Sequence, residues 1–355
     1  NGAPVTTQYR LEETTPGAQW DAFVEASPNG TIFSLSAYLA AVRQPSRLFW
    51  CLNGNERRAA VAVTESADGT CAVQHDFVIH NGILFAPPAN KQNRSTVLSE
   101  RFEIAVDVAA SLSRRYQRVE LALSPQVTDI RPFLWHNYGK DDAPRYVADV
   151  RYTAYASLAG FADAAAPEDV PLFPEISYSR RQEVRKALKT GVRTTEDATP
   201  EDLAAFYALT MGRQGIEVEH DRLDELRDLA AAVLAGGFGR LFATRTPEGE
   251  LAAMALFGMD SKRAYYLFGA GDPHLRNTPC GTAVLWDAFG QLARAGVTEV
   301  DLEGVNSPRR GWFKLSFGAD ILPYYQLVKD GPEPAEPTEQ PEQPGQAEQA
   351  GQAAQ

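Results

Sequence analysis

The stretch DLEGVNSPRRGWFKLSFG, residues 301–318, combines the features that decide both fold and chemistry in this chain. It begins on an alternating segment that predicts a β-strand with Asp301 and Glu303 on the same face. A turn of Gly, Asn, Ser and Pro follows, and an apolar segment then flanks Lys314 on both sides. Burying a lysine without a partner is costly, so this setting is typical of a working cation. The alternative is a side chain that extends along the apolar face to solvent.

The order of elements around this stretch occurs twice in the chain. In each half an amphipathic helix leads to a short strand, a Ser-Pro pair, an aromatic segment that ends in Gly, and a further strand. Aligning the two closing glycines places Trp135 opposite Lys314, and aligning the strands places Ala122 opposite Glu303. A duplicated scaffold with apolar residues in one copy and charges in the other indicates that the charged copy is the working one. The alternative is that charges have drifted onto an exposed loop.

The pattern of elements predicts an α+β protein of two tandem domains, each a mixed twisted sheet flanked by helices. We expect the first domain, the non-catalytic copy, at residues 1–155 and the second, the working copy, at 156–330. Residues 331–355 are rich in Pro, Gln and Glu without an apolar pattern, which predicts a disordered tail. Two shorter segments have their own predictions: a strand at 71–79, and a linker or surface crossing at 161–175.

Composition limits the classes of function. The 355 residues include 34 Lys and Arg against 46 Asp and Glu, and the formal net charge of −12 argues against bulk nucleic-acid binding, although a local basic groove is compatible with it. Three cysteines without a CxxC pair are typical of reduced thiols in a cytoplasmic protein, and Cys280 is interpreted as a bystander thiol. Five histidines without ligand spacing predict no metal site. No apolar run approaches the roughly 20 residues of a membrane span, and from the opening residues we expect no signal peptide.

Several motifs carry a resemblance to a known family. They are SPNGTIF at 27–33, RQEVRKALKTGV at 181–192, the AYY segment at 264–266, the helix at 281–296 that ends in Ala-Gly, and residues 301–325. The second half resembles an acyltransferase domain of the GNAT superfamily. The whole of residues 1–330 resembles the tandem-GNAT Fem-type peptidyltransferases, which move an amino acid from aminoacyl-tRNA to an amine.

The sequence departs from ordinary acetyl-CoA GNAT enzymes at two places. Those enzymes have a Q/R-x-x-G-x-G/A turn that binds pyrophosphate through backbone N–H groups, whereas here Thr278 replaces Gln/Arg and Pro279 removes a donor. Lys314 stands where such enzymes often have a general-acid Tyr, and the Fem-type pattern has Phe-Lys there, which matches Phe313 and Lys314. The coiled-coil arm of some Fem proteins is absent, so the resemblance implies a soluble precursor or small molecule as acceptor.

The resemblance and the residue types together give candidate roles. Lys314 is expected to stabilise the oxyanion or a phosphate, and Glu303 or Asp301 to accept the amine proton; either acid could instead be only an ion-pair partner. Substrate-binding candidates are Phe313, Arg309, Arg310, Tyr265, Tyr266, Tyr325 and Trp312. Candidates for tRNA or phosphate binding are Arg181, Arg185, Lys186 and Lys189, for which a solvated helix face is the alternative.

The leading prediction of function is an aminoacyltransferase that forms an amide between the aminoacyl group of aminoacyl-tRNA and the amine of a peptidoglycan-precursor-like or small-molecule acceptor. It needs no cofactor beyond the aminoacyl-tRNA cosubstrate. An alternative is an N-acyltransferase that uses acetyl-CoA or another acyl-CoA. A third alternative, of another class, is a non-catalytic tandem GNAT protein that binds a ligand.

Overall fold

The computed structural model describes residues 8–213 and 215–333, so most of the expected tail lies outside the described residues. The part before the chain midpoint contains, in order, β1 (Arg10–Thr14), α1 (Ala18–Ala26), α2 (Ser36–Ala41), β2 (Ser46–Asn53), β3 (Glu56–Thr64), β4 (Cys71–Ala72), β5 (Gly82–Phe85), α3 (Arg94–Arg115), β6 (Arg118–Ala122), α4 (Arg131–Leu134) and β7 (Tyr146–Ser157). The later part contains α5 (Tyr178–Thr190), β8 (Arg193–Thr195), α6 (Pro200–Gly212), α7 (His220–Ala235), β9 (Gly239–Arg245), β10 (Leu251–Met259), β11 (Ala264–Gly271), α8 (Cys280–Arg294), β12 (Glu299–Asp301), α9 (Pro308–Leu315) and β13 (Asp320–Asp330).

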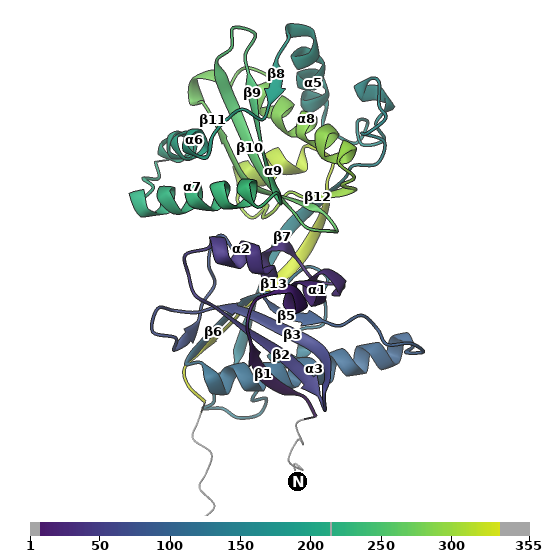
Figure 1. Cartoon of the computed structure of the whole chain (residues 1–355), viewed down its shortest axis with the longest axis vertical. Helices are drawn as coiled ribbons and strands as arrows, with labels where there is room; N and C mark the ends of the chain where they lie inside the picture. Colours follow the sequence, from purple (N-terminus) through teal and green to yellow (C-terminus); the bar gives the residue numbers. More distant parts are fainter. Residues whose placement is uncertain (1–7, 214, 334–355) are drawn as a thin grey trace, which may run out of the picture.

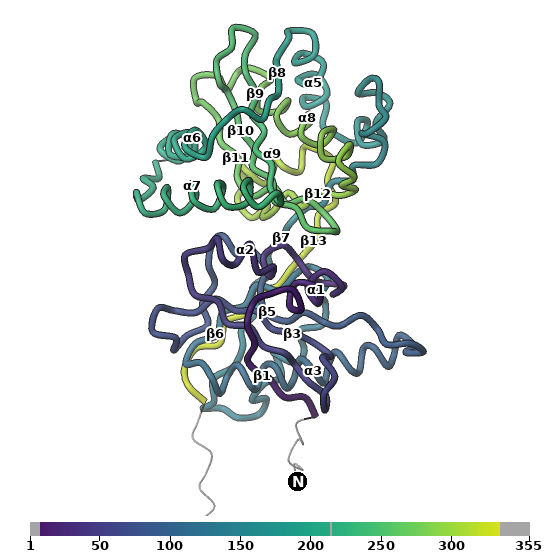
Figure 2. Tube along the Cα trace, in the orientation of Figure 1, coloured from purple at the N-terminus to yellow at the C-terminus, as the bar shows by residue number. Residues whose placement is uncertain are grey.

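The chain forms two lobes that are joined by two long strands (Figure 1). The first lobe comprises β1 to β6 with α1 to α4, and the second lobe comprises α5 to α9 with β8 to β12. Strands β7 and β13 run side by side from one lobe into the other, as the Cα trace also shows (Figure 2). The expected α+β class is confirmed; of the two sheets, the larger contains parallel and antiparallel pairs and the smaller is antiparallel throughout.

One sheet of nine strands crosses both lobes in the order β4-β6-β13-β7-β12-β11-β10-β9-β8. β7 and β13 are antiparallel and pair along ten residues, from Asp320 with Tyr155 to Lys329 with Tyr146. The far end of β13 pairs with β6 in the first lobe, while β7 pairs with β12 in the second. A second sheet, β1-β2-β3-β5, belongs to the first lobe alone.

Apolar packing holds the two lobes against each other. One buried cluster combines Trp20, Phe33 and Tyr38 of the first lobe with Leu229 of α7 and Tyr265 of β11. Helix α2 accordingly packs against α7 across the junction (Figure 1). The other two clusters lie within the second and first lobes respectively. Burial of apolar surface contributes about 25 cal/mol per Å². The shared cluster therefore stabilises the contact between the two lobes.

Local sequence explains where the basic helix α5 begins and ends. The side chain of Ser177, at the N-cap, accepts a hydrogen bond from the backbone N–H of Arg180 at 3.3 Å. Gly191 follows the last turn with φ 77, a left-handed conformation that favours glycine. The next helix, α6, begins with a capping box between Thr199 and Asp202.

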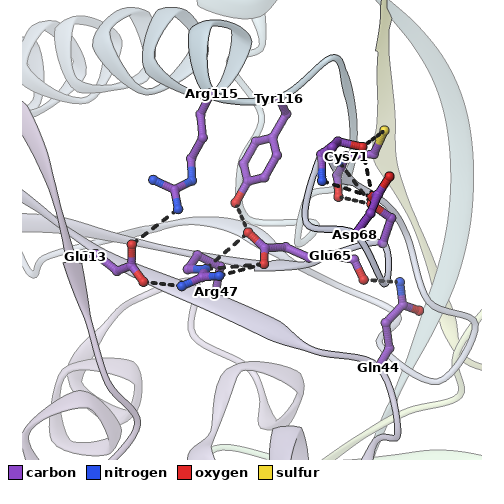
Figure 3. Close-up of polar contacts among 10 residues, drawn as sticks. Glu13, Gln44, Arg47, Glu65, Asp68, Cys71, Arg115 and Tyr116 are labelled. Atoms are coloured by element: carbon purple, nitrogen blue, oxygen red, sulfur yellow. Dashed lines mark hydrogen bonds and ion pairs between the residues drawn. The ribbon is translucent and has the colours of Figure 1, made fainter.

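A charged network ties the first-lobe sheet to helix α3 (Figure 3). Glu65 is buried and is held by the guanidinium of Arg47, at 3.1 Å, and by the hydroxyl of Tyr116, at 2.6 Å. Arg47 also pairs with Glu13, which in turn meets Arg115 at 3.3 Å. A buried carboxylate needs such partners, and here they connect β1, β2 and the end of α3.

Two of the shorter sequence predictions are wrong. Only Cys71 and Ala72 of segment 71–79 form a strand; beyond them the chain turns towards the junction, where the carbonyl of Phe77 accepts a hydrogen bond from the hydroxyl of Tyr38. Segment 161–175 is no simple surface crossing, because its apolar side chains are buried in the second-lobe core. None of the helices in 8–213 and 215–333 is long and apolar enough to span a membrane.

Candidate active site

The candidate site lies where the nine-stranded sheet opens in the second lobe. Strands β11 and β12 are parallel but pair at only two positions, the last being Tyr265 with Asp301. β12 ends there, and Glu303 adopts φ 61, a conformation that residues other than glycine adopt rarely. The alternating strand expected through residue 303 therefore stops early, because the backbone turns left-handed at Glu303. Such strain is often stored at functional sites.

Asp301 is fully buried and firmly held. Its Oδ1 accepts hydrogen bonds from the hydroxyl of Thr153 at 2.5 Å and from the backbone N–H of Glu303 at 2.8 Å. Its Oδ2 has no hydrogen-bond partner in the described part of the chain. Burial raises the pKa of this carboxyl to about 6, against the lowering effect of these two hydrogen bonds.

Glu303 is buried with both carboxylate oxygens free of hydrogen bonds to the residues that the structure describes. Burial, and then the neighbouring Asp301, raise its pKa well above the usual range, while Lys314 acts in the opposite direction. A buried carboxyl that no protein donor satisfies is unusual and calls for a ligand or water as its partner. Its raised pKa also makes its carboxylate a stronger base than an ordinary glutamate.

Lys314 enters the site from helix α9, which the sequence pattern did not indicate as a helix. Pro308 stands at its first turn, and Gly311 lets it approach the preceding loop, since a Cβ there would meet the carbonyl oxygen of Val305 at 2.6 Å. The ammonium of Lys314 donates to the carbonyl of Gly304 at 3.2 Å and lies 5.4 Å from the ring centre of Tyr266. Burial lowers its pKa to about 8, although the nearby carboxyls raise it.

The first lobe also contributes to this site, which sequence reasoning missed. Tyr38 of α2 and Tyr324 of β13 both lie close enough to Glu303 for its charge to raise their pKa values, after the larger effect of burial. The His80 ring packs edge-on against Tyr324, with centroids 4.9 Å apart. No short-range sequence signal marks these residues, because the two lobes bring them together.

The aromatic substrate-binding candidates have different surroundings in the structure. Tyr266 lies beneath the Lys314 ammonium and stacks on Phe257. Tyr265 is a core residue whose hydroxyl donates to Asp260 at 2.6 Å. Tyr325 packs against the first-lobe core, and its neighbour Tyr324 is the one near Glu303, since adjacent strand residues point to opposite faces.

The remaining candidates on α9 face three directions. Phe313 packs on Phe317 and under the guanidinium of Arg180, 5.1 Å from its ring centre. Trp312 is 76% exposed and Arg309 is also exposed. Arg310 lies near Lys314 and lowers its pKa, after the larger effect of burial. Arg310 also lines a cavity of about 840 Å³ whose other walls come from both lobes: Arg43, Tyr207, Met211, Ile216, Glu217, Val218, Glu219, Asp221, Arg222 and Glu225.

The cationic side chains of the basic helix α5 are of two kinds: some bind other residues of the chain, and others are exposed to solvent. Arg181 donates to the carbonyl oxygens of Pro174 and Ile176, and Arg185 pairs with Glu168 at 2.9 Å. Lys186 and Lys189 are exposed. The two lysines are therefore the members of this group that are available to an external anion.

The start of helix α8 is the position at which acetyl-CoA enzymes bind pyrophosphate. Here Pro279 is the N-cap residue and supplies no N–H. The carboxylate of Glu183, from α5, accepts a hydrogen bond from the hydroxyl of Thr282 in the first turn of α8. Arg180 donates to the same carboxylate at 2.5 Å. The ion pair of Glu183 and Arg180 therefore already lies at this helix start, where the helix dipole would otherwise favour an incoming phosphate.

Comparisons with known proteins give likenesses in one domain and in the overall fold. Residues 177–309 match the profile of the acetyltransferase (GNAT) domain family, whereas comparison with curated protein sequences gives no match. Among solved structures, FemX aligns with a TM-score of 0.58 and 14% identity, over 88% of this chain and 96% of that one.

Two further structures align at the level of the fold. L-PGS from Bacillus licheniformis gives a TM-score of 0.50 and 11% identity, over 87% of this chain and 90% of that one. A tandem GNAT protein from the clavulanic acid biosynthesis pathway gives a TM-score of 0.50 and 12% identity, over 92% of this chain and 100% of that one. Residues 177–309 are therefore similar to a GNAT acetyltransferase domain, and the fold of the whole chain is similar to the folds of FemX and of this tandem GNAT protein.

Proposed function

We propose that this protein is an aminoacyltransferase that moves an aminoacyl group from aminoacyl-tRNA to an amine and so forms an amide bond. The observation that carries the proposal is the pair of Lys314 and Glu303 at the end of β12, a desolvated ammonium beside a buried carboxyl without a protein hydrogen-bond donor in the described residues. Amide formation from an ester needs a base for the amine and a cation for the developing oxyanion. This pair supplies both.

On this proposal the two side chains divide the proton transfers of the reaction between them. The acceptor nitrogen attacks the ester carbonyl, the C–N bond forms, and the bond from the carbonyl carbon to the ribose oxygen breaks. Glu303 accepts the proton that the amine loses, since its raised pKa makes it a competent base. The ammonium of Lys314 stabilises the oxyanion and gives a proton to the departing ribose oxygen, and the proton held by Glu303 then restores it. Asp301, held by Thr153, fixes the strand end from which Glu303 projects.

The donor is inferred from the start of α8. Acetyl-CoA binding there requires free backbone donors and a site that attracts phosphate, whereas this chain has Pro279 and the carboxylate of Glu183 at that position. The Phe313-Lys314 pair also matches the Fem-type pattern. We place the acceptor end of the tRNA over the exposed cations Lys186, Lys189 and Arg309, which suit backbone phosphates.

The acceptor amine is placed in the cavity that Arg310 lines beside Lys314. Its volume suits a small molecule or the end of a soluble precursor. On this proposal residues 156–330 form the transferase and residues 1–155 form the copy that does not itself carry the reacting groups.

A second candidate is an N-acyltransferase that uses an acyl-CoA. The observation in its favour is the match of residues 177–309 to an acetyltransferase family.

The test is a transfer assay with purified protein, tRNA charged with labelled amino acids, and a pool of small amines and peptides. We expect amine-dependent loss of label from tRNA and its appearance in an amide product. Lys314→Met should abolish transfer, and Lys140→Met, at an exposed lysine of the first lobe, should leave it unchanged. Transfer at near-native rate by Lys314→Met, or no transfer from any charged tRNA, would overturn the proposal.

A further inference from the structure

The cavity of about 840 Å³ between the lobes has an excess of negative charge in its wall. Four acids and three arginines line it: Glu217, Glu219, Asp221, Glu225, Arg43, Arg222 and Arg310. Two of these arginines also pair with acids outside the wall, Arg43 with Asp228 at 2.5 Å and Arg222 with Asp76. The positive charge of the wall is therefore partly compensated from outside, and the cavity favours a cationic ligand.

Glu225, on α7, is the buried acid of this wall. Only 7% of it is exposed, whereas Glu217, Glu219 and Asp221 are exposed. Its Oε2 accepts a hydrogen bond from the guanidinium of Arg222 at 3.2 Å, but its Oε1 has no hydrogen-bond partner among the described residues. Proteins usually satisfy a buried carboxylate oxygen. Since Glu225 lines the cavity, a ligand in the cavity is the natural source of the missing donor.

The side chain nearest to this oxygen does not supply that donor. Nε2 of His75 is 2.9 Å from Oε1 of Glu225, in a direction that forms no hydrogen bond. The other ring nitrogen, Nδ1, accepts the backbone N–H of Phe77 at 3.1 Å, which fixes the orientation of the ring. Burial lowers the pKa of His75, so the ring brings no full positive charge to Glu225 at neutral pH.

Helix α9 connects the cavity to the reacting groups. Arg310 lines the cavity, and Lys314 is four residues further along the same helix, so the two side chains lie on one face, one turn apart. The guanidinium of Arg310 also contacts Sδ of Met211, another residue of the wall, at 3.5 Å. A molecule in the cavity can therefore have one end at Lys314 and another at Glu225.

We propose that the acceptor is a basic amine with a second cationic group, such as a diamine, and that Glu225 binds the second ammonium. The other nitrogen reaches Lys314 and Glu303 as the neutral amine that attacks the ester. Tyr207 adds an aromatic ring to the same wall, and ammonium groups favour aromatic surroundings. For transfer this inference rests on the proposed function, whereas the binding of the diamine does not depend on it.

The first test measures binding to the full chain by isothermal titration calorimetry, without tRNA. The probes are cadaverine, pentylamine and 5-aminovalerate, which are of similar length and end in an ammonium, a methyl and a carboxylate group. Cadaverine should bind about tenfold more tightly than pentylamine, because a hydrogen bond to a charged group has about this effect. Equal affinity for these two, or tighter binding of 5-aminovalerate, would overturn the proposal.

Glu225→Gln tests the residue itself, since it keeps the shape of the side chain and removes its charge. It should raise the Kd of cadaverine about tenfold, to that of pentylamine, and leave the Kd of pentylamine unchanged. Asp224→Asn is the matched control: Asp224 is the neighbouring acid of α7, lies outside the cavity wall and pairs with Arg227 at 2.8 Å. An equal loss in both variants, or no loss in Glu225→Gln, would refute the assignment.

A third variant covers a failure of Glu225→Gln to fold. Glu225→Asp keeps the charge and withdraws the carboxylate by one methylene group, so it should weaken cadaverine several-fold and leave pentylamine unchanged. Unchanged affinity for cadaverine in that variant would count against Glu225 as the binding residue.

The transfer assay separates this inference from the proposed function. The wild type should use cadaverine with about tenfold higher kcat/KM than pentylamine, and Glu225→Gln should lose this preference through KM. Binding of cadaverine that depends on Glu225, without transfer from any charged tRNA, would remove the proposed function and leave the diamine site standing. Transfer to both amines with equal kcat/KM would have the opposite meaning.

Discussion

The hydroxyl of Thr153 on β7 donates to the carboxylate of Asp301 on β12 at 2.5 Å, inside the fully buried part of the sheet. The same carboxylate oxygen receives the backbone N–H of Glu303. Asp301 therefore fixes the point at which β12 ends, and Glu303 remains the carboxyl without protein donors among the described residues. The two acids, equivalent as candidates in the sequence, have different surroundings in the fold.

Thr153→Val should destabilise the protein by about 1 to 3 kcal/mol, the usual cost of leaving a buried acceptor unsatisfied. Valine keeps the shape of threonine and removes the hydroxyl donor to Asp301. Urea denaturation measures the loss. An unchanged free energy of unfolding would mean that this hydrogen bond contributes nothing to the junction.

The pH dependence of stability should reveal the buried Asp301. Its pKa is raised from 3.8 to about 6, so the folded protein binds a proton in this range that the unfolded chain releases. The proton on Asp301 therefore stabilises the folded protein fully below about pH 4, and this stabilisation is lost as the pH rises through about 6. The difference is roughly 3 kcal/mol, since one pKa unit corresponds to about 1.36 kcal/mol.

Asp301→Asn removes that titration. As the pH rises from about 4 to about 6, the wild type should therefore lose free energy of unfolding relative to Asp301→Asn. Urea titrations at a series of pH values measure it. A difference that stays constant with pH would contradict the assigned burial.

Lys329→Met should destabilise the protein by about 1 to 3 kcal/mol. The Lys329 ammonium is buried and donates to the carbonyl oxygens of Ser113, Tyr116 and Gly331, so it joins β13 to the end of α3. Methionine fills the space but leaves these carbonyls without their donor. Thermal and urea unfolding measure the loss of stability. Lys140→Met, at an exposed lysine, is the control. Equal stability of the two variants would contradict the role assigned to Lys329.

Acetyl-CoA should not raise the melting temperature of the wild-type protein, because Glu183 and Pro279 make the start of α8 a poor phosphate site. A true cosubstrate at about 100 times its Kd would stabilise the fold by about 2.7 kcal/mol. Glu183→Gln removes the negative charge and should permit a small shift at high acetyl-CoA. Clear stabilisation of the wild type would favour the acyl-CoA candidate over aminoacyl-tRNA.

Much of the architecture could be predicted from periodicity and turn residues. The amphipathic pattern of residues 97–116 predicts the helix α3, and the strand-like patterns of residues 47–52 and 58–64 predict β2 and β3. Both have regular patterns that local propensity and burial reinforce. Helix α9 was not predicted, although it contains residues 312–315 of the apolar segment, because eight residues with Pro at the start and Gly inside give a weak periodic signal.

The site could be predicted only where its residues are close in sequence. Lys314 and Glu303 were found because they stand in one charged stretch that its duplicate lacks. Tyr38 was missed because packing between the lobes, which leaves no local sequence pattern, brings it close to Glu303. Tyr325 was chosen in place of Tyr324 because alternation on a strand gives two faces without saying which one is turned towards the junction.

The path of β13 has a consequence for how the chain is made. Gln326 of β13 pairs with Ala122 of β6, so β6 gains this neighbour only after roughly 200 further residues have been translated. At synthesis rates of about 5 to 20 residues per second, the emerging first half waits roughly 10 to 40 s with an open sheet edge. During that interval the nascent polypeptide needs shielding from other unpaired strands, and a chain that stops upstream of Asp320 leaves β6 without β13 as its neighbour.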